Sequence, residues 1–179
     1  PADKQQRARR LDGIFGWMDK NRDGAWTREE FNANFSHGSG KPLLVAIRPG
    51  GRGDITSSHV KWELNRGIPE IPSPAFYQNH IYMVRSGGLL SAVDARNGKV
   101  LYSERLGGPG QYSASPVIAN GRLYLASEPG QITVVKTGGK FEILHQHKLG
   151  EPIHVTPALD KNTIYIRSAR HLWAFRNKN

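Results

Sequence analysis

The sequence predicts a mainly β protein: a partial β-propeller of about three four-stranded antiparallel blades, preceded by an N-terminal helix–loop–helix unit. Three observations predict this architecture. Short runs of β-branched and aromatic residues, separated by turns rich in Gly, Pro and Asn, fill the chain from residue 42 onward. Landmarks within these runs recur with a period of roughly 40 residues, as propeller blades do. An acidic loop between two apolar helical patterns predicts the N-terminal unit.

The N-terminal unit centres on residues 19–30, which read DKNRDGAWTREE. This pattern suits calcium, because a hard cation of that size takes about six to eight oxygens and alternate residues of a tightly wound loop turn their oxygens inward. Gly24 permits the sharp turn in the middle of the loop. The predicted metal ligands are the side chains of Asp19, Asn21, Asp23, Thr27 and Glu30, together with the backbone carbonyl of Ala25.

Apolar residues at helical spacing flank the loop on both sides: Leu11, Ile14, Phe15 and Met18 before it, and Phe31 and Phe35 after it. Over about residues 4–36 the sequence therefore resembles the EF-hand family. The resemblance implies an α-helical EF-hand with calcium as its cofactor. Gly13 and Gly16 lie inside the first predicted helix and weaken it by about 1 kcal/mol each relative to alanine. We therefore expect calcium or packing to order this unit, as a structural clip.

Residues 37–41, with the sequence HGSGK, are predicted to be a linker, because Gly and Ser favour a flexible chain. The linker separates the EF-hand at residues 1–36 from the propeller at residues 42–179. The helical period ends before it, and the period of short strands begins after it.

The propeller repeat is marked by a hydroxyl residue followed by proline, and then by a tyrosine. The repeating residues are Ser73-Pro74, Ser115-Pro116 and Thr156-Pro157, followed by Tyr82, Tyr124 and Tyr165. Strand A of each blade is expected after the proline, strand B through the tyrosine, strand C next, and strand D after a Gly-Lys pair. The predicted blades are 42–69 (partial), 70–111, 112–152 and 153–179 (without its last strand).

Units such as SPVIANGRLYLASEPGQITVVKTGGKFEIL resemble the repeats of quinoprotein-like propellers, also called PQQ-like, over about residues 42–179. Members of that class include non-catalytic scaffolds, such as outer-membrane protein assembly factors, and alcohol or sugar dehydrogenases. The resemblance implies a bacterial protein that is periplasmic or otherwise exported. Ring closure needs at least about four blades. We therefore expect a C-terminal fragment of a longer protein, whose remaining blades would be its partners.

The expected function is that of a calcium-binding, non-catalytic propeller module for protein or ligand interaction, and no catalytic or cofactor-binding residue is assigned. The segments 112–113 and 154–155 lead into strand A, where propellers usually present a ligand face. The alternative is part of a PQQ-dependent quinoprotein dehydrogenase. By resemblance, such an enzyme holds its cofactor with a vicinal cysteine pair and a stacking tryptophan. The sequence contains no cysteine, so PQQ is not expected unless blades outside this chain carry the catalytic residues.

The amino-acid composition limits the classes of binding partner that we expect. The net charge is +10, but the basic residues are spread singly and are not interleaved with aromatic residues, so no specific nucleic-acid partner is predicted. No apolar run approaches the roughly 18 residues of a transmembrane segment. His145 and His147 would share one face of a strand and could share a metal, although two exposed histidines are common on an outer strand and this is the favoured interpretation.

Overall fold

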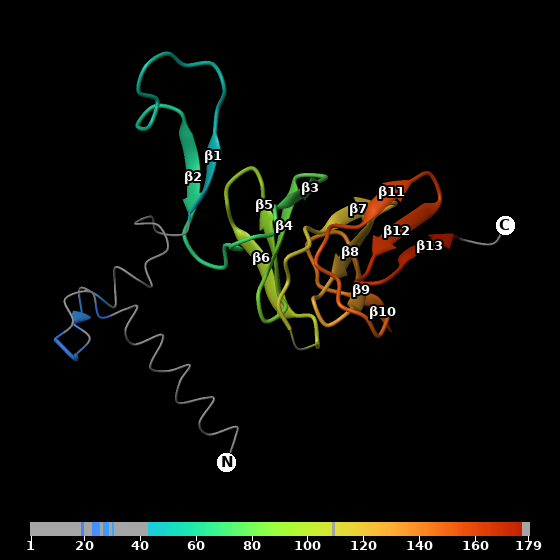
Figure 1. Cartoon of the computed structure of the whole chain (residues 1–179). Helices are drawn as coiled ribbons and strands as arrows, with labels where there is room; N and C mark the ends of the chain where they lie inside the picture. Colours follow the sequence, from blue (N-terminus) through green and yellow to red (C-terminus); the bar gives the residue numbers. More distant parts are fainter. Residues whose placement is uncertain are drawn as a thin grey trace. The chain divides into compact units, whose positions relative to one another are not determined.

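The computed structural model describes residues 19, 23–25, 27, 28, 30, 43–108 and 110–176. The chain divides into two compact units, Pro1–Lys41 and Pro42–Asn179. Within the described residues, the second unit consists of β-strands arranged in four antiparallel sheets (Figure 1). The predicted mainly β class was therefore correct.

The α-helical EF-hand predicted for the N-terminal unit was wrong as a statement of fold class. The described residues form no helix. Among those of the N-terminal unit, only Arg28 and Glu30 have a helical backbone conformation. Both predicted flanking helices lie mostly outside the described residues. The helical period is a weak guide here, because short helices gain most of their stability from packing, and Gly13 and Gly16 reduce the intrinsic preference for helix.

Each sheet is a meander in which strands adjacent in sequence pair with one another. The first sheet contains β1 (Leu44–Ile47) and β2 (Val60–Leu64). The second contains β3 (Ala75–Tyr77), β4 (His80–Arg85), β5 (Leu89–Asp94) and β6 (Val100–Arg105). The third contains β7 (Val117–Ala119), β8 (Arg122–Ala126), β9 (Gln131–Lys136) and β10 (Ile143–Lys148). The fourth contains β11 (Ala158–Asp160), β12 (Thr163–Arg167) and β13 (Leu172–Arg176).

The turn between the first two strands of a sheet shows why these hairpins form. Asn120 and Gly121 connect β7 to β8 with φ angles of +50° and +69°. Two positive φ values in a two-residue connection match the right-handed twist of the flanking strands, and Asn-Gly is the favoured pair for such a turn. The corresponding turn between β3 and β4 places Gln78 and Asn79 at φ values of +46° and +61°. The same local geometry is thus repeated in successive sheets.

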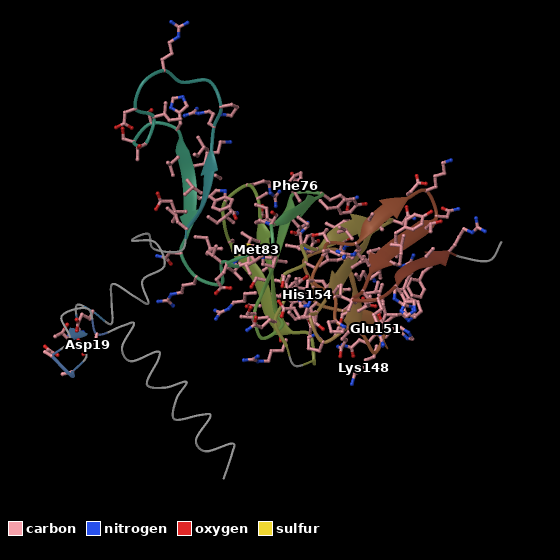
Figure 2. All side chains as sticks on the ribbon, viewed as in Figure 1. Asp19, Phe76, Met83, Lys148, Glu151 and His154 are labelled. Carbon is pink, nitrogen blue, oxygen red and sulfur yellow. The ribbon has the colours of Figure 1, made fainter. Side chains whose placement is uncertain are left out.

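The main core lies between the second and third sheets. Its fully buried members come from both sheets: Tyr82, Val84, Leu90 and Ala92 from the second, and Leu123, Leu125 and Val135 from the third. The backbone N–H of Gly138 donates to the Tyr82 hydroxyl at 2.6 Å, so the only polar atom of that side chain is satisfied. Met83 is also buried, whereas Phe76 is largely exposed (Figure 2). Tyr82, Met83 and Val84 are consecutive and all buried, so both faces of β4 are covered.

A smaller core joins the third sheet to the fourth, through Ala126, Ile132, Ile153 and Ile166, with Trp173 packed against them. The first hairpin is attached by a different contact. The Trp62 indole N–H donates to the carbonyl of Ala95 at 3.0 Å, and its ring lies against Gly98. Trp62 and Trp173 therefore both have packing roles.

The Ser/Thr-Pro repeat forms a series of hydrogen bonds between sheets. The backbone N–H of Ser73 donates to Ser115 Oγ at 2.9 Å, and the N–H of Ser115 donates to Thr156 Oγ1 at 3.0 Å. The bonded residues are 42 and 41 positions apart, which is the repeat length. Each hydroxyl thus accepts a hydrogen bond from a backbone N–H at the start of the preceding sheet. These bonds link the segments that lead into the short first strands β3, β7 and β11.

Replacing Thr156 with valine is expected to lower the free energy of unfolding by about 0.5–1 kcal/mol, because the N–H of Ser115 loses its acceptor in a partly solvated position. Thr156→Ser keeps the hydroxyl and should cost less. Urea unfolding of both variants measures the difference. Equal losses in the two variants would mean that the hydroxyl contributes nothing to the contact between sheets.

Candidate functional site

The first half of the predicted calcium loop is held by its own acidic side chains. The Asp19 carboxylate is buried and accepts the backbone N–H groups of Asp23 at 3.2 Å and Gly24 at 3.0 Å. The Asp23 carboxylate accepts the N–H of Ala25 at 2.8 Å. Gly24 has a φ of +80°, which glycine adopts without strain. Asp19 and Asp23 therefore shape the turn, while Asn21 lies outside the described residues.

The second half of the loop forms a reciprocal cap. Glu30 Oε2 accepts both the backbone N–H and the hydroxyl of Thr27, each at 3.1 Å, and the N–H of Glu30 donates to Thr27 Oγ1 at 3.2 Å. This is the capping-box arrangement. No group of three or more His, Asp or Glu side chains gathers as a metal cluster anywhere in the described part of the chain. The predicted oxygens are chemically suited to calcium, and their assignment as ligands remains a prediction.

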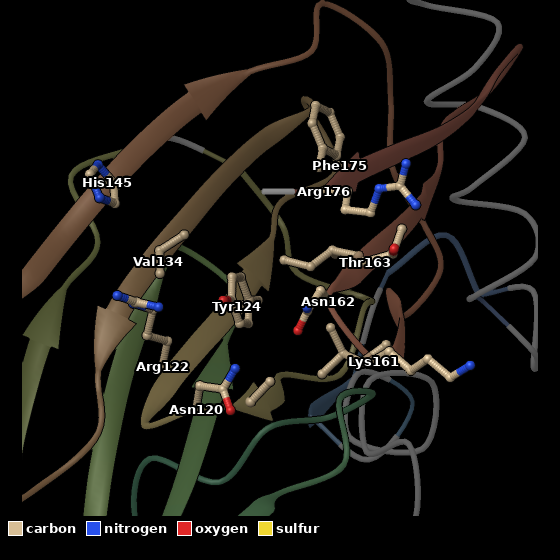
Figure 3. A pocket seen from close by; sticks show the side chains of 13 residues that line it. Asn120, Arg122, Tyr124, Val134, His145, Lys161, Asn162, Thr163, Phe175 and Arg176 are labelled. Carbon is tan, nitrogen blue, oxygen red and sulfur yellow. The ribbon is translucent and has the colours of Figure 1, made fainter. Parts of the chain in front are cut away.

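A groove lies between the third and fourth sheets. It consists of two adjoining clefts of about 350 Å³ and 390 Å³, which share four lining residues: Tyr124, Val134, Ile164 and Phe175. We refer to both clefts together as the β13 groove. Figure 3 shows side chains of the two sheets facing each other across it. Its shared floor is aromatic and aliphatic, so the groove suits apolar side chains.

The charged side chains that line the β13 groove are all basic. Arg122, Lys161 and Arg176 line the first cleft, and no Asp or Glu lines either cleft. His145 lines the first cleft and His147 the second. The two histidines thus lie on the same side of β10, as predicted, but as groove residues outside any described metal cluster. The groove can therefore receive a ligand with apolar groups and a negative charge.

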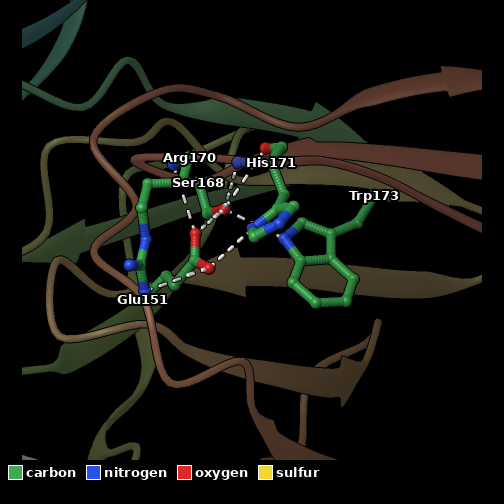
Figure 4. A network of polar contacts seen from close by, with 5 residues as sticks. All are labelled: Glu151, Ser168, Arg170, His171 and Trp173. Atoms are coloured by element: carbon green, nitrogen blue, oxygen red, sulfur yellow. Dashed lines mark hydrogen bonds and ion pairs between the residues drawn. The ribbon is translucent and has the colours of Figure 1, made fainter.

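A polar network surrounds Glu151, a buried residue in the loop that connects β10 to β11 (Figure 4). Its carboxylate accepts the Ser168 hydroxyl at 2.6 Å and the backbone N–H of Arg170 at 3.2 Å, and contacts His171 Nδ1 at 2.6 Å. The indole N–H of Trp173 donates to Ser168 Oγ at 2.9 Å. These bonds tie the segment before β11 to the turn between β12 and β13.

The Glu151 network holds a Ser, a His and a carboxylate without the geometry of a catalytic triad. The Ser168 hydroxyl donates to the carboxylate, and Ser168 is only 4% exposed. A nucleophile instead needs its hydroxyl bonded to the base and open to a substrate. The hydrogen bond from Ser168, and then those from His171 and Arg170, hold the pKa of Glu151 below its usual range. The network therefore stabilises a turn.

Stability is expected to depend on the ionised form of Glu151. Because its pKa in the folded chain lies below the ordinary 4.5, its contribution is present above that value and is lost as pH falls through the lowered pKa. We expect Glu151→Gln to lower the urea midpoint at about pH 7, and the gap from the unmodified chain to shrink by about pH 3. A gap that is the same at both pH values would contradict a role for the charge.

The ligand face predicted from the sequence differs from the groove. Tyr112 is buried, Ser113 donates to Glu128, and His154 lies 3.9 Å from the same carboxylate. The groove instead lies at the opposite end of the short first strands, where the turn between β11 and β12 contributes Lys161. The repeat predicts that successive sheets lie side by side, which could have indicated a groove between the third and the fourth.

The family comparison agrees with this repeat. The family model PQQ_2, described as outer membrane protein assembly factor BamB, matches residues 51–179. The chain belongs to this family. The PQQ-like part of the predicted resemblance is therefore confirmed, and the match does not include the residues assigned to the EF-hand. No curated protein matches the sequence.

Two solved structures, BamB and the designed Ika8 protein, show the same fold at low sequence identity. BamB from Moraxella catarrhalis is 14% identical with a TM-score of 0.59, and the match covers 76% of this chain and 40% of that one. The computationally designed Ika8 protein is 14% identical with a TM-score of 0.56, covering 77% and 44%. A europium-containing methanol dehydrogenase is 12% identical with a TM-score of 0.46, covering 59% and 21%. The chain thus spans less than half the length of these structures.

Proposed function

We propose that this chain is a non-catalytic protein-interaction module of an exported bacterial protein. The observation that carries the proposal is the β13 groove, which combines an apolar floor with a basic end that includes Arg176 of β13. Grooves of this kind receive protein segments, because alternate side chains of a bound strand can enter the apolar floor. The family is described as an outer membrane protein assembly factor, which supports an interaction role and the exported location.

The proposal also rests on how the most enzyme-like cluster is used. The Ser168 hydroxyl and the Glu151 carboxylate are engaged with one another, and both residues are buried. The sequence has no cysteine that could hold a quinone cofactor in the manner expected of the dehydrogenases. Within the described residues, no helix has the length and apolar character to cross a membrane. Among the described residues, no observation specifically favours the dehydrogenase alternative.

Photo-crosslinking tests the interaction role. A photoreactive phenylalanine analogue at Phe175 lies in the groove, and the same analogue at Phe76 is a matched control, since both are exposed aromatic residues on strands. After irradiation in bacterial cells that export the chain, we expect a protein adduct from position 175 and not from position 76. Absence of a protein adduct at both positions would overturn the interaction role.

We further propose that residues 19–30 bind calcium, with Asp19, Asn21, Asp23, Thr27, Glu30 and the Ala25 carbonyl as ligands. The hydrogen bonds of Asp19 and the positive φ of Gly24 support this proposal, because they wind the loop tightly around its acidic side chains. Bound calcium would supply a positive charge that draws the acidic side chains together. A structural role within the N-terminal unit suits a loop whose acidic groups already hold its backbone.

Glu30→Gln is expected to weaken calcium binding by at least about tenfold, because it removes one of the negative charges that set affinity for a hard cation. Glu29→Gln is the matched control, since it removes the same charge outside the predicted ligand set. Calcium titration followed by the fluorescence of Trp17 and Trp26 measures both. Equal affinity in the two variants, or no fluorescence change in the unmodified chain, would refute the site. Chelation should leave the strands of the propeller folded.

A further inference from the structure

The connections at one end of the sheets are basic. In an antiparallel meander, the third-to-fourth connections lie at the end opposite to the connections that lead from one sheet to the next. Residues 95–99 lead into β6 and residues 137–142 into β10, and residues 48–59 hold the same place before β2, which also leads into the next sheet. We call these three connections together the cationic end. Its basic residues are Arg48, Arg52, Arg96, Lys99 and Lys140, and its acidic residues are Asp54 and Glu142.

The connections that lead from one sheet to the next have the opposite balance of charge. Residues 65–74 contain one cation and one acid, and residues 106–116 contain no Lys, Arg, Asp or Glu. Residues 149–157 contain one acid, Glu151, and no Lys or Arg. These connections are on average longer than those of the cationic end, so their smaller number of cations does not follow from their length. The basic residues of the connections are therefore concentrated at one end of the sheets.

Successive connections of the cationic end are neighbours in the fold. A Cβ at Gly139 would lie 3.7 Å from Leu101 of β6, and a Cβ at Gly98 would lie 2.8 Å from Trp62 of β2. Each of these two connections thus rests on the last strand of the preceding sheet. The hydrogen bonds between the Ser/Thr-Pro segments align the starts of the sheets, so their opposite ends are aligned as well. The cations of the three connections therefore form a row that crosses three sheets.

The acidic side chains of the cationic end are engaged elsewhere in the chain. The Glu142 carboxylate pairs with the ammonium group of Lys136 on β9 at 3.0 Å. The Asp54 carboxylate accepts the backbone N–H of Thr56 in its own loop at 2.9 Å. Within the described residues, neither carboxylate forms an ion pair with a basic residue of the cationic end. The two acids therefore leave most of the positive charge of this end available.

Each connection of the cationic end carries one cation that is available for binding: Arg52, Lys99 and Lys140. All three residues are exposed, and their side chains form no ion pair or hydrogen bond with any residue that the structure describes. Arg96 is different, because its guanidinium group is paired with Asp94 at 2.6 Å. The row of available cations thus has one member on each of three successive sheets.

This arrangement favours a broad anionic surface as the ligand. The available cations belong to three different sheets and do not line the β13 groove, so they are placed to meet several negative charges rather than one. The ring of Phe141 packs against the core, so it is not offered to stack on a nucleic-acid base. Lysine is a compact charge that attracts lipid phosphates without the fixed geometry of a bidentate contact. A phospholipid surface matches these features best.

We infer that the cationic end binds the surface of an anionic phospholipid bilayer. Each lysine or arginine close to such a surface strengthens binding by about fivefold, so three available cations give a measurable affinity. The attraction is electrostatic and falls as salt screens the charges. The inference goes beyond the proposed interaction function, because binding to lipid requires neither the β13 groove nor its protein partner.

Co-sedimentation of the full chain with vesicles tests this inference. We expect binding to phosphatidylcholine vesicles that contain about one quarter phosphatidylglycerol, and none to vesicles of phosphatidylcholine alone. The double variant Lys99→Glu with Lys140→Glu should bind the anionic vesicles at least about tenfold more weakly. The matched control is Arg85→Glu with Lys148→Glu, which changes the net charge equally at exposed strand residues of the opposite end. Its affinity should stay within about twofold of that of the unmodified chain. Circular dichroism confirms that each variant is folded.

A conservative variant and three other outcomes decide the result. Lys99→Arg with Lys140→Arg keeps both charges and should bind like the unmodified chain. Failure of the unmodified chain to bind the anionic vesicles overturns the inference. Equal losses in the two charge-reversal variants also overturn it, because net charge and not the cationic end would then govern binding. Binding to a DNA duplex, without binding to vesicles, would make a nucleic acid the ligand and would overturn it as well.

Discussion

Gly130→Ala is expected to lower the free energy of unfolding by about 2–5 kcal/mol, one of the largest effects of any single substitution in this chain. Gly130 has a φ of +91°, a conformation that residues with a Cβ adopt at a cost. An added Cβ would overlap the carbonyl oxygen of Glu151 and lie 3.0 Å from its carbonyl carbon. These are backbone atoms, and the nearby bond from the N–H of Leu149 to the Gly130 carbonyl, at 2.9 Å, holds the two segments together.

Gly150→Ala is the matched control for Gly130→Ala. Gly150 also has a positive φ, +72°, but an added Cβ would have no atom within 4 Å. It should therefore cost only the backbone strain, about 1–2 kcal/mol. Comparing the urea unfolding of the two variants separates the cost of backbone strain from the cost of steric overlap with Glu151. If both variants lost the same stability, the close approach of Glu151 to Gly130 would not be the feature that requires glycine.

Leu123→Ala is expected to cost about 2–5 kcal/mol, because it removes a fully buried side chain and leaves a cavity. Leu123 has no exposed surface and belongs to the core that joins the second sheet to the third. Its loss therefore weakens the contact between two sheets as well as the packing within one. We expect the unfolding transition to move to lower urea concentration without a change in slope.

The control for Leu123→Ala is Leu172→Ala on β13. Leu172 is a leucine on a strand of the next sheet, but it is 72% exposed. Its truncation should change stability by less than about 0.5 kcal/mol. A comparable loss in the two variants would show that Leu123 does not lie in a shared core, and would count against the face-to-face packing of the sheets.

The repeat made the sheets predictable, because one landmark carries several physical roles. In the sequence, Ser115 and Thr156 stand out only by their spacing. In the structure, their hydroxyls accept backbone N–H groups of the preceding sheet. Tyr82 was a landmark of strand B, and it is buried between two sheets with its hydroxyl bonded to Gly138. Residues that must meet the same neighbour in every unit recur at the same interval, so the sequence records them.

The site was less predictable, because its residues meet only through packing. Glu151 and His171 are 20 positions apart and occur once, so no period brings them to attention. The β13 groove forms where side chains of the third and fourth sheets face each other, so no single repeat unit contains it. The helical patterns that flank the calcium loop lie mostly outside the described residues, and such a pattern alone is weak evidence, because short helices gain most of their stability from packing.

Amide hydrogen exchange of β13 tests most directly whether the groove is open to a protein segment. β9 is the internal reference, because it holds the same place in its sheet and has β10 on its outer side. The amides of β13 that do not pair with β12 are expected to exchange at least about 100-fold faster than those of β9 in the free chain. Protection of every β13 amide to the level of β9 would show that the edge is already covered, and would contradict an open groove.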